Sequence, residues 1–186
     1  VTEMDRDLDR LDKIASRFGQ MGSVPTLKEA DLANVVTETV SYFRHRVPHL
    51  GREVEIVERY EPIPKVAFHV DLMEWVVENL IRNAIDATDK WSGKIEVSLA
   101  WRPEQREVEL RVKDNGRGMT PAERRHAFEP GFTTKRRGWG LGLALARRVV
   151  HEYHRGRISI VETVPGQGTT VAVVLPVSSS PVQGSP

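Results

Sequence analysis

Residues 78–87, Glu-Asn-Leu-Ile-Arg-Asn-Ala-Ile-Asp-Ala, lie in a predicted helix that runs from Asp71 to about Thr88. Asn79, Asn83 and Asp86 fall at positions i, i+4 and i+7, so they share one face of this helix beside an apolar face. Two carboxamides one turn apart can coordinate a hard cation such as magnesium through their oxygens. On these residues alone, a solvated polar face is the commoner interpretation.

Four segments downstream have compositions that suit a nucleotide. Residues 114–119, Asp-Asn-Gly-Arg-Gly-Met, follow a predicted strand, and the two glycines let the backbone approach a flat ligand. Residues 138–143, Gly-Trp-Gly-Leu-Gly-Leu, open a predicted helix, whose first amides can bind anionic oxygens. Residues 128–135, Phe-Glu-Pro-Gly-Phe-Thr-Thr-Lys, supply hydroxyls and an ammonium, and residues 166–170, Gly-Gln-Gly-Thr-Thr, join the last two strands. Taken singly, each segment could be an ordinary turn or hairpin.

The elements predicted around these segments alternate between helix and strand. A capping box, Thr26 to Glu29, is expected to open a helix with an apolar face from Leu32 to Val47. Alternating or apolar runs predict strands at 53–59, 66–70, 94–102, 107–113, 157–163 and 169–176, with a further helix at 141–153. We therefore predict an α+β fold in which helices cover one face of a mixed sheet.

The composition of the 186-residue chain is that of a globular protein. Its 27 Lys and Arg against 26 Asp and Glu leave a net charge of +1, which argues against nucleic-acid binding. The absence of cysteine excludes disulfides, cysteine zinc ligands and thiol nucleophiles, and fits a reducing compartment. No apolar run reaches the eighteen or so residues that a membrane span needs.

The first twenty residues carry a heptad pattern. The apolar positions alternate in spacings of four and three, namely Met4, Leu8, Leu11, Ala15 and Phe18. Such a seam packs a helix either on its own domain or in an intermolecular bundle, and its narrow stripe favours the bundle. From Val177 onward the composition predicts a disordered tail.

Together the five segments resemble the ATP-binding domain of sensor histidine kinases, within a wider family that includes gyrase and the mitochondrial dehydrogenase kinases. Residues 78–87 correspond to the N box, 114–119 to the first glycine box, 128–135 to the F box, 138–143 to the second glycine box and 166–170 to the third. They occur in the family's order within residues 50–176. The resemblance implies a two-layer α/β sandwich of the Bergerat type, preceded by an N-terminal helix.

The resemblance also implies ATP and Mg²⁺ as ligands. Asn83 would hold the magnesium, Asn79 would assist at the phosphates, and Asp114 would bind the adenine amino group. Asn79 and Lys135 are the residues expected to act in phosphoryl transfer. Other nucleotide contacts are expected from Asp86, Gly116, Gly118, Met119, Phe128, Thr133, Thr134, Lys135, Gly138, Gly140, Leu141, Gly142, Leu143 and Thr169.

One position bears on the reaction. Asn79 stands where the ATPase branches of this family have a glutamate thought to activate water. Because an amide cannot take a proton from water, transfer to a protein side chain is favoured over rapid hydrolysis. The resemblance implies a histidine kinase domain that donates the γ-phosphoryl to a histidine, for relay to the receiver domain of a response regulator. An anti-sigma-type serine/threonine kinase and a non-catalytic ATP-sensing module remain alternatives.

None of the six histidines has the sequence context of a phosphoacceptor. His151-Glu152 lacks the residues that should follow it, and His154-Arg155-Gly156 stands where the family often has His-Gly-Gly. We therefore expect the acceptor outside this chain, and no autophosphorylation without it. The implied organisation is the end of a dimerisation hairpin at 1–22, through which the parent would form a homodimer, a linker at 23–28, the ATP domain at 29–176 and a disordered tail at 177–186. The fragment is expected to be cytoplasmic, without membrane contact.

Overall fold

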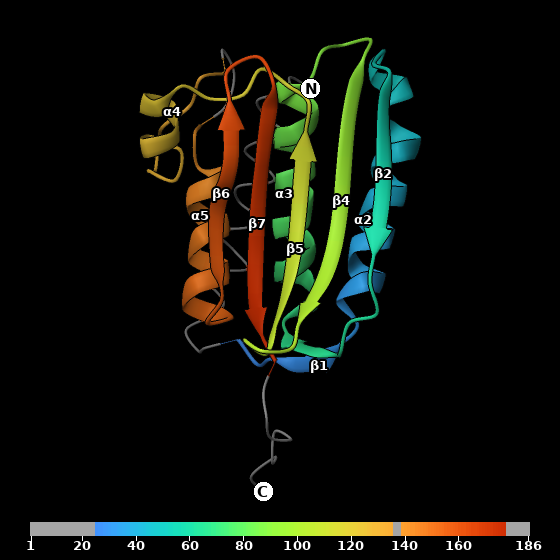
Figure 1. Ribbon diagram of the computed structural model, residues 1–186, viewed down its shortest axis with the longest axis vertical. Coiled ribbons are helices and arrows are strands. Elements are labelled where there is room, and N and C mark those ends of the chain that lie inside the picture. The colour runs from blue at the N-terminus through green and yellow to red at the C-terminus, as the bar shows by residue number, and fades with distance from the viewer. Residues whose placement is uncertain (1–24, 136–138, 178–186) are drawn as a thin grey trace, which may run out of the picture.

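The computed structural model describes residues 25–135 and 139–177, which form a twisted five-stranded sheet and a small two-stranded sheet. The large sheet has the strand order β2-β4-β5-β7-β6 (Figure 1). Its strands are β2 Val54–Tyr60, β4 Gly93–Arg102, β5 Glu107–Asp114, β6 Arg157–Val164 and β7 Gly168–Pro176. Because β2 and β4 are parallel whereas the other neighbours are antiparallel, the sheet is mixed, as predicted.

Three helices cover one face of this sheet. They are α2 Leu32–Arg46, α3 Val70–Ala87 and α5 Gly142–Arg148, and α3 lies between the other two behind the strands in Figure 1. The apolar face of α3 is buried completely, with Val76, Val77 and Ile81 at 0% exposure. The predicted α+β fold with helices on one face is confirmed. Among the described residues, no helix has the length and apolar character needed to cross a membrane.

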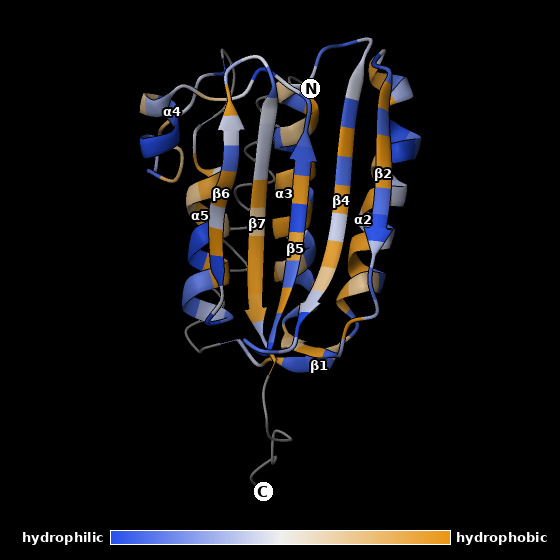
Figure 2. Ribbon diagram, in the orientation of Figure 1, coloured by the Kyte–Doolittle hydropathy of each residue, from blue (hydrophilic) through white to orange (hydrophobic). Residues whose placement is uncertain are grey.

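The opposite face of the sheet is polar. Hydrophilic and hydrophobic residues alternate along β4 and β5, as Figure 2 shows, because successive side chains of a strand point to opposite faces. The outer side chains form ion pairs within and between strands, Glu55 with Lys94, Arg59 with Glu96, Arg102 and Arg111 with Glu109, and Arg157 with Glu107. One face therefore builds the core while the other is covered by paired charges.

The structure differs from the predicted elements mainly at short segments. The capping box at Thr26 is wrong: Lys28–Ala30 forms strand β1, which pairs antiparallel with β3, Val66–Phe68, and α2 is capped by Asp31, whose carboxylate accepts from Ala33 N. Helix α3 begins at Val70, one residue before the predicted start at Asp71, and His69 is its N-cap residue. A further helix, α4 Pro121–His126, opens with a capping box between Thr120 and Glu123 that the sequence analysis missed.

Arginine side chains bind main-chain carbonyls on both edge strands of the large sheet. At the β2 edge, Arg44 of α2 donates to Ile56 O from Nε at 3.1 Å and from Nη2 at 2.6 Å. At the β6 edge, Arg124 of α4 donates from Nη2 to Ile160 O at 3.0 Å. Each contact satisfies a carbonyl where the sheet has no further strand.

His154 joins the end of the α5 segment to the start of α3. The predicted helix at 141–153 is α5 followed by a π-helical turn, Val149–Tyr153, and His154 comes directly after it, 2% exposed. Its Nδ1 lies 2.8 Å from Val149 O, and its Nε2 lies 3.1 Å from the amide nitrogen of His69. Both contacts are satisfied only by a neutral ring that carries its proton on Nδ1. Burial lowers the pKa of His154 below 6.5.

The free energy of unfolding should therefore fall in acid. The unfolded chain binds a proton at His154 near pH 6.5 whereas the folded chain binds it only at lower pH, so stability from this group is complete above pH 6.5 and is lost as the pH falls. The expected loss is up to about 1.4 kcal/mol per pH unit in the window between the two pKa values. Urea unfolding between neutral and mildly acidic pH measures it. In His154→Gln this slope should flatten, whereas exposed His45→Gln should keep it; equal slopes in all three proteins would contradict the assignment.

Candidate functional site

The end of β5 presents a buried carboxyl group. Asp114 is 6% exposed, and its Oδ1 accepts from Gly116 N at 2.8 Å. Burial raises the pKa of Asp114, although the amides of Gly116 and Thr169 and the charge of Arg117 favour its ionised form. Main-chain donors thus fix the carboxyl in place, and it retains lone pairs that can accept from a ligand amine.

The first glycine box packs tightly against two other segments. A Cβ on Gly116 would lie 2.4 Å from Ala87 O at the end of α3, and the next amide, Arg117 N, donates to that same oxygen at 3.0 Å. Gly118 has φ +65°, and its Cβ would lie 1.9 Å from Val164 O in the β6–β7 hairpin. The backbone therefore has no room for side chains at either glycine.

A pair of threonines supports the first glycine box. Met119 N donates to Thr163 Oγ1 at 2.9 Å, and this hydroxyl oxygen lies 2.9 Å from Thr169 Oγ1. Thr163 and Thr169 are register partners across the β6–β7 hairpin. Thr163 was not among the predicted site residues. Its position in the strand that pairs with the third glycine box could have indicated that it lies near the site.

The N box meets the second glycine box where α3 faces the start of α5. Asn79 Nδ2 is buried without a hydrogen-bond partner among the described residues. A Cβ on Gly142, the first residue of α5, would lie 2.4 Å from Asn79 Oδ1. Because a buried donor without a partner costs about 1–3 kcal/mol, Asn79 is suited to an acceptor such as a phosphate oxygen.

Lys135 closes the exposed end of the N box. Its Nζ donates to Asn83 Oδ1 at 2.8 Å and lies 2.7 Å from Asp86 Oδ2. Amide and carboxylate oxygens are the protein ligands that magnesium uses, and here a cationic group already lies against both. The residues present therefore fit a magnesium ion at Asn83.

Arg117 connects the first glycine box to the F box. Its Nη1 donates to Glu123 Oε1 at 3.1 Å, and its Nη2 donates to Thr134 Oγ1. This residue was not predicted as part of the site. Its position between two glycines was only a weak signal for a site residue. The glycines indicate a tight turn, but they do not show which residues the arginine side chain contacts.

The remaining predicted residues lie around these contacts. Phe128 is half-buried, and the guanidinium of Arg147 lies 5.7 Å from its ring centroid. Thr133 is exposed, and its hydroxyl accepts from Lys135 N at 3.1 Å. Gly140 has φ +64°, and its carbonyl accepts from Gly131 N at 3.1 Å. Leu141 and Leu143 are half-buried at the start of α5. Gly138 and the heptad seam from Met4 to Phe18 lie outside the described residues.

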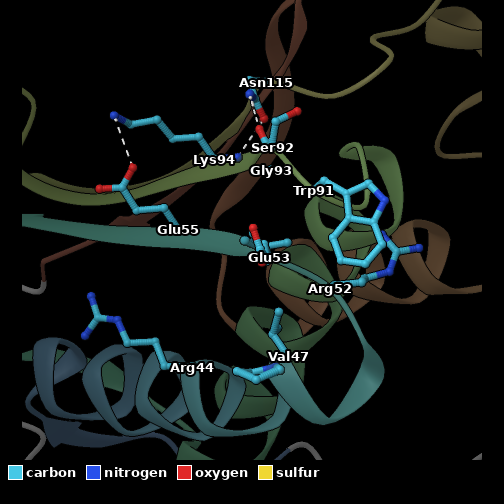
Figure 3. Close-up of a pocket in the computed structure, with 12 residues that line it drawn as sticks. Arg44, Val47, Arg52, Glu53, Glu55, Trp91, Ser92, Gly93, Lys94 and Asn115 are labelled. Atoms are coloured by element: carbon cyan, nitrogen blue, oxygen red, sulfur yellow. Dashed lines mark hydrogen bonds and ion pairs between the residues drawn. The ribbon is translucent and has the colours of Figure 1, made fainter.

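The groove shown in Figure 3 lies beside this site. It has a volume of about 600 Å³ and is lined by the end of α2 and the starts of β2 and β4. Asn115 reaches it, where its Oδ1 accepts from Lys94 N at 2.7 Å and its Nδ2 donates to Ser92 O at 3.0 Å. These bonds anchor the first glycine box to β4, so Asn115 has a structural part beside the site.

All five boxes are thus joined by direct contacts. The N box touches the first glycine box through Ala87, the F box through Asn83 and the second glycine box through Asn79. The third glycine box reaches the first, because Gly166 N donates to Arg117 O at 2.7 Å. A buried acceptor, glycine-rich turns and amide side chains joined in this way suit a nucleotide-binding domain. Residues 69–179 match the family of histidine kinase-, DNA gyrase B- and HSP90-like ATPases, and the chain belongs to this family.

Within this family, the chain is similar to sensor histidine kinases, as two curated relatives show. Sensor histidine kinase ZraS of Klebsiella oxytoca is 31% identical over 94% of this chain. Sensory histidine kinase/phosphatase NtrB of Rhizobium meliloti is 32% identical over 96% of it. The chain spans 37% of the length of ZraS and 51% of that of NtrB.

A solved histidine kinase has the same fold. The catalytic domain of ThkA superposes with a TM-score of 0.71 at 24% identity, covering 82% of this chain and 96% of that domain. ThkA in complex with response regulator protein TrrA superposes with a TM-score of 0.72 at 21% identity, covering 94% of this chain and 49% of that one. This likeness establishes the two-layer architecture.

Proposed function

We propose that residues 29–176 bind Mg-ATP and act as the catalytic domain of a two-component sensor histidine kinase. The observation that carries this proposal is the direct contact among all five boxes at one end of α3. Asp114 would accept from the adenine amino group, Asn79 would donate to a phosphate oxygen, and Asn83 would hold the metal. A bound magnesium ion would neutralise phosphate charge during phosphoryl transfer.

Asn79 favours transfer over hydrolysis. Its side-chain amide cannot act as the general base that attack by water requires. The side chain packs against Gly142 at the start of α5. Slow hydrolysis would keep ATP available for an incoming protein nucleophile. We propose that this nucleophile is a histidine, as the names of ZraS and NtrB suggest.

Three of the chain's six histidines already have ring contacts within the fold. His154 is buried with both ring nitrogens engaged, and His126 lies against Glu129 at 2.8 Å. His45 Nδ1 lies 2.7 Å from Ser41 O in α2. We propose that the acceptor belongs to a dimerisation hairpin of a longer protein, that residues 1–22 end that hairpin, and that a response regulator receives the phosphate. The absence of cysteine suits a cytoplasmic location for this domain.

Labelled ATP tests the proposed reaction directly. The chain is mixed with a hairpin protein that carries the acceptor histidine, and the products are examined for acid-labile phosphate. Label on that histidine supports the kinase, and its replacement by alanine should abolish the label. A hairpin that stays unlabelled while ATP binds would refute histidine phosphorylation, and acid-stable label would indicate a serine/threonine kinase.

Asn83→Ala should remove the magnesium-dependent part of nucleotide binding. The variant loses the amide oxygen that faces the proposed metal, so its affinity with magnesium should fall to the value measured in EDTA. Exposed Asn34 of α2 supplies a matched control, because Asn34→Ala makes the same change away from the site. Calorimetric titration with and without magnesium measures the effect. An Asn83→Ala chain that still responds fully to magnesium would place the metal elsewhere.

A further inference from the structure

The ammonium group of Lys135 occupies the oxygen expected to hold the metal, that of Asn83, and also contacts the nearby carboxylate of Asp86. Asn83 Oδ1 and Asp86 Oδ2 both lie within 2.8 Å of Lys135 Nζ. A divalent cation at Asn83 needs the same oxygen lone pair, and it would repel an ammonium group only a few ångströms away. Lys135 must therefore move before a metal ion can bind there.

The ion pair between Lys135 and Asp86 is weak enough for a metal ion to displace the lysine. The side chains of Lys135 and Asp86 are each 39% exposed, so water screens their attraction. Ion pairs with such exposure change an equilibrium constant by a factor of only about 1.5–5. A metal ion brought in by a nucleotide can displace the lysine at this cost, and the lysine can return when the metal leaves.

The neighbouring residues keep Lys135 beside the site after displacement. Thr134 accepts from Arg117 of the first glycine box, and Thr133 Oγ1 accepts from Lys135 N at 3.1 Å. These two contacts do not involve Asn83 or Asp86. The backbone of Lys135 can therefore stay in place while its long side chain turns from the N box toward the phosphates.

We propose that Lys135 and magnesium compete for Asn83 and Asp86, so that the lysine becomes available to the phosphates only when the metal is in place. The proposal rests on the proposed function, since it requires that Mg-nucleotide binds here. Lys135 is then a positioning residue as well as a phosphate contact. In the free protein it neutralises Asp86, and in the loaded protein it is released.

Magnesium titration of a complex with fluorescent ADP tests this competition. ADP is used because it lacks the γ-phosphate. The Lys135→Met variant therefore cannot lose affinity through a missing contact between Lys135 and that phosphate. The magnesium concentration at half effect is measured for wild type, Lys135→Met and Lys65→Met. Lys65 is an exposed lysine at the loop before β3 and supplies the matched loss of charge.

Lys135→Met should need roughly 1.5- to fivefold less magnesium than wild type, because the competing cation is gone. Lys65→Met should behave as wild type, and the difference should shrink at high salt, which screens the Lys135–Asp86 pair. An equal or higher magnesium requirement in Lys135→Met would overturn the proposal. If ADP binds but magnesium has no effect in any protein, the competition is rejected while nucleotide binding stands. If ADP does not bind at all, the proposed function itself fails.

Discussion

Asp114→Asn should weaken ATP binding roughly ten- to hundredfold and reduce the preference for adenine over guanine nucleotides. Hydrogen bonds to charged groups contribute about 1.5–3 kcal/mol, and the variant removes the charge that would accept from the adenine amine. Its carboxamide would also place an NH₂ group in a pocket where the carboxylate already accepts from Gly116 N at 2.8 Å. Competition binding with ATP and GTP against a fluorescent nucleotide measures both effects.

Asp71→Asn is the control for this change. Asp71 is exposed in the first turn of α3, at the opposite end of that helix from Ala87 and the first glycine box. The control should leave both affinities unchanged. If Asp114→Asn also keeps the wild-type ratio of ATP to GTP affinity, Asp114 does not select the base and the adenine end has been placed wrongly.

Gly168→Ala should lower the free energy of unfolding by roughly 2–5 kcal/mol and impair nucleotide binding with it. Gly168 has φ +107°, and a Cβ there would lie 1.9 Å from Asp114 O. The conformation alone costs an alanine about 1–2 kcal/mol, and the overlap with the main chain adds about 1–3 kcal/mol. Since β5 and β7 pair at Asp114 and Thr169, relief of the overlap would move the buried carboxyl. Urea unfolding and nucleotide titration measure the two effects.

Gly166→Ala separates these two costs. Gly166 lies in the same hairpin with φ +76°, but a Cβ there would have nothing within 4 Å. This variant should lose only about 1 kcal/mol and keep its nucleotide affinity. Equal losses in the two variants would show that conformation alone governs this hairpin and that the approach to Asp114 is unimportant.

The long elements could be predicted because each carries its own periodic pattern. Strands β4 and β5 alternate over ten and eight residues, and α3 keeps an apolar face over eighteen. By contrast, β1 has three residues and α4 has six, which is too short for a pattern to emerge. The start of α2 was misplaced because β1 depends on β3, a partner more than thirty residues away.

The site was predictable in its spacing but not in its long-range contacts. Asn79 and Asn83 share a helix face by simple periodicity, and resemblance supplied their proposed roles. The contact between Lys135 and Asn83 joins residues 52 positions apart, and that between Thr163 and Met119 joins residues 44 apart. Such contacts follow from the arrangement of the strands, which no local pattern in the sequence specifies.

The arginine contacts at the two sheet edges bear on how the protein behaves when concentrated. An unpaired edge strand is a template on which another chain can add a strand, and this is a common start of aggregation. Arg44 occupies Ile56 O on β2, and Arg124 occupies Ile160 O on β6. Each guanidinium also brings a charge to the edge, which a second sheet would have to bury. A further strand at either edge would have to displace these contacts, so both sides of the sheet disfavour growth into fibrils.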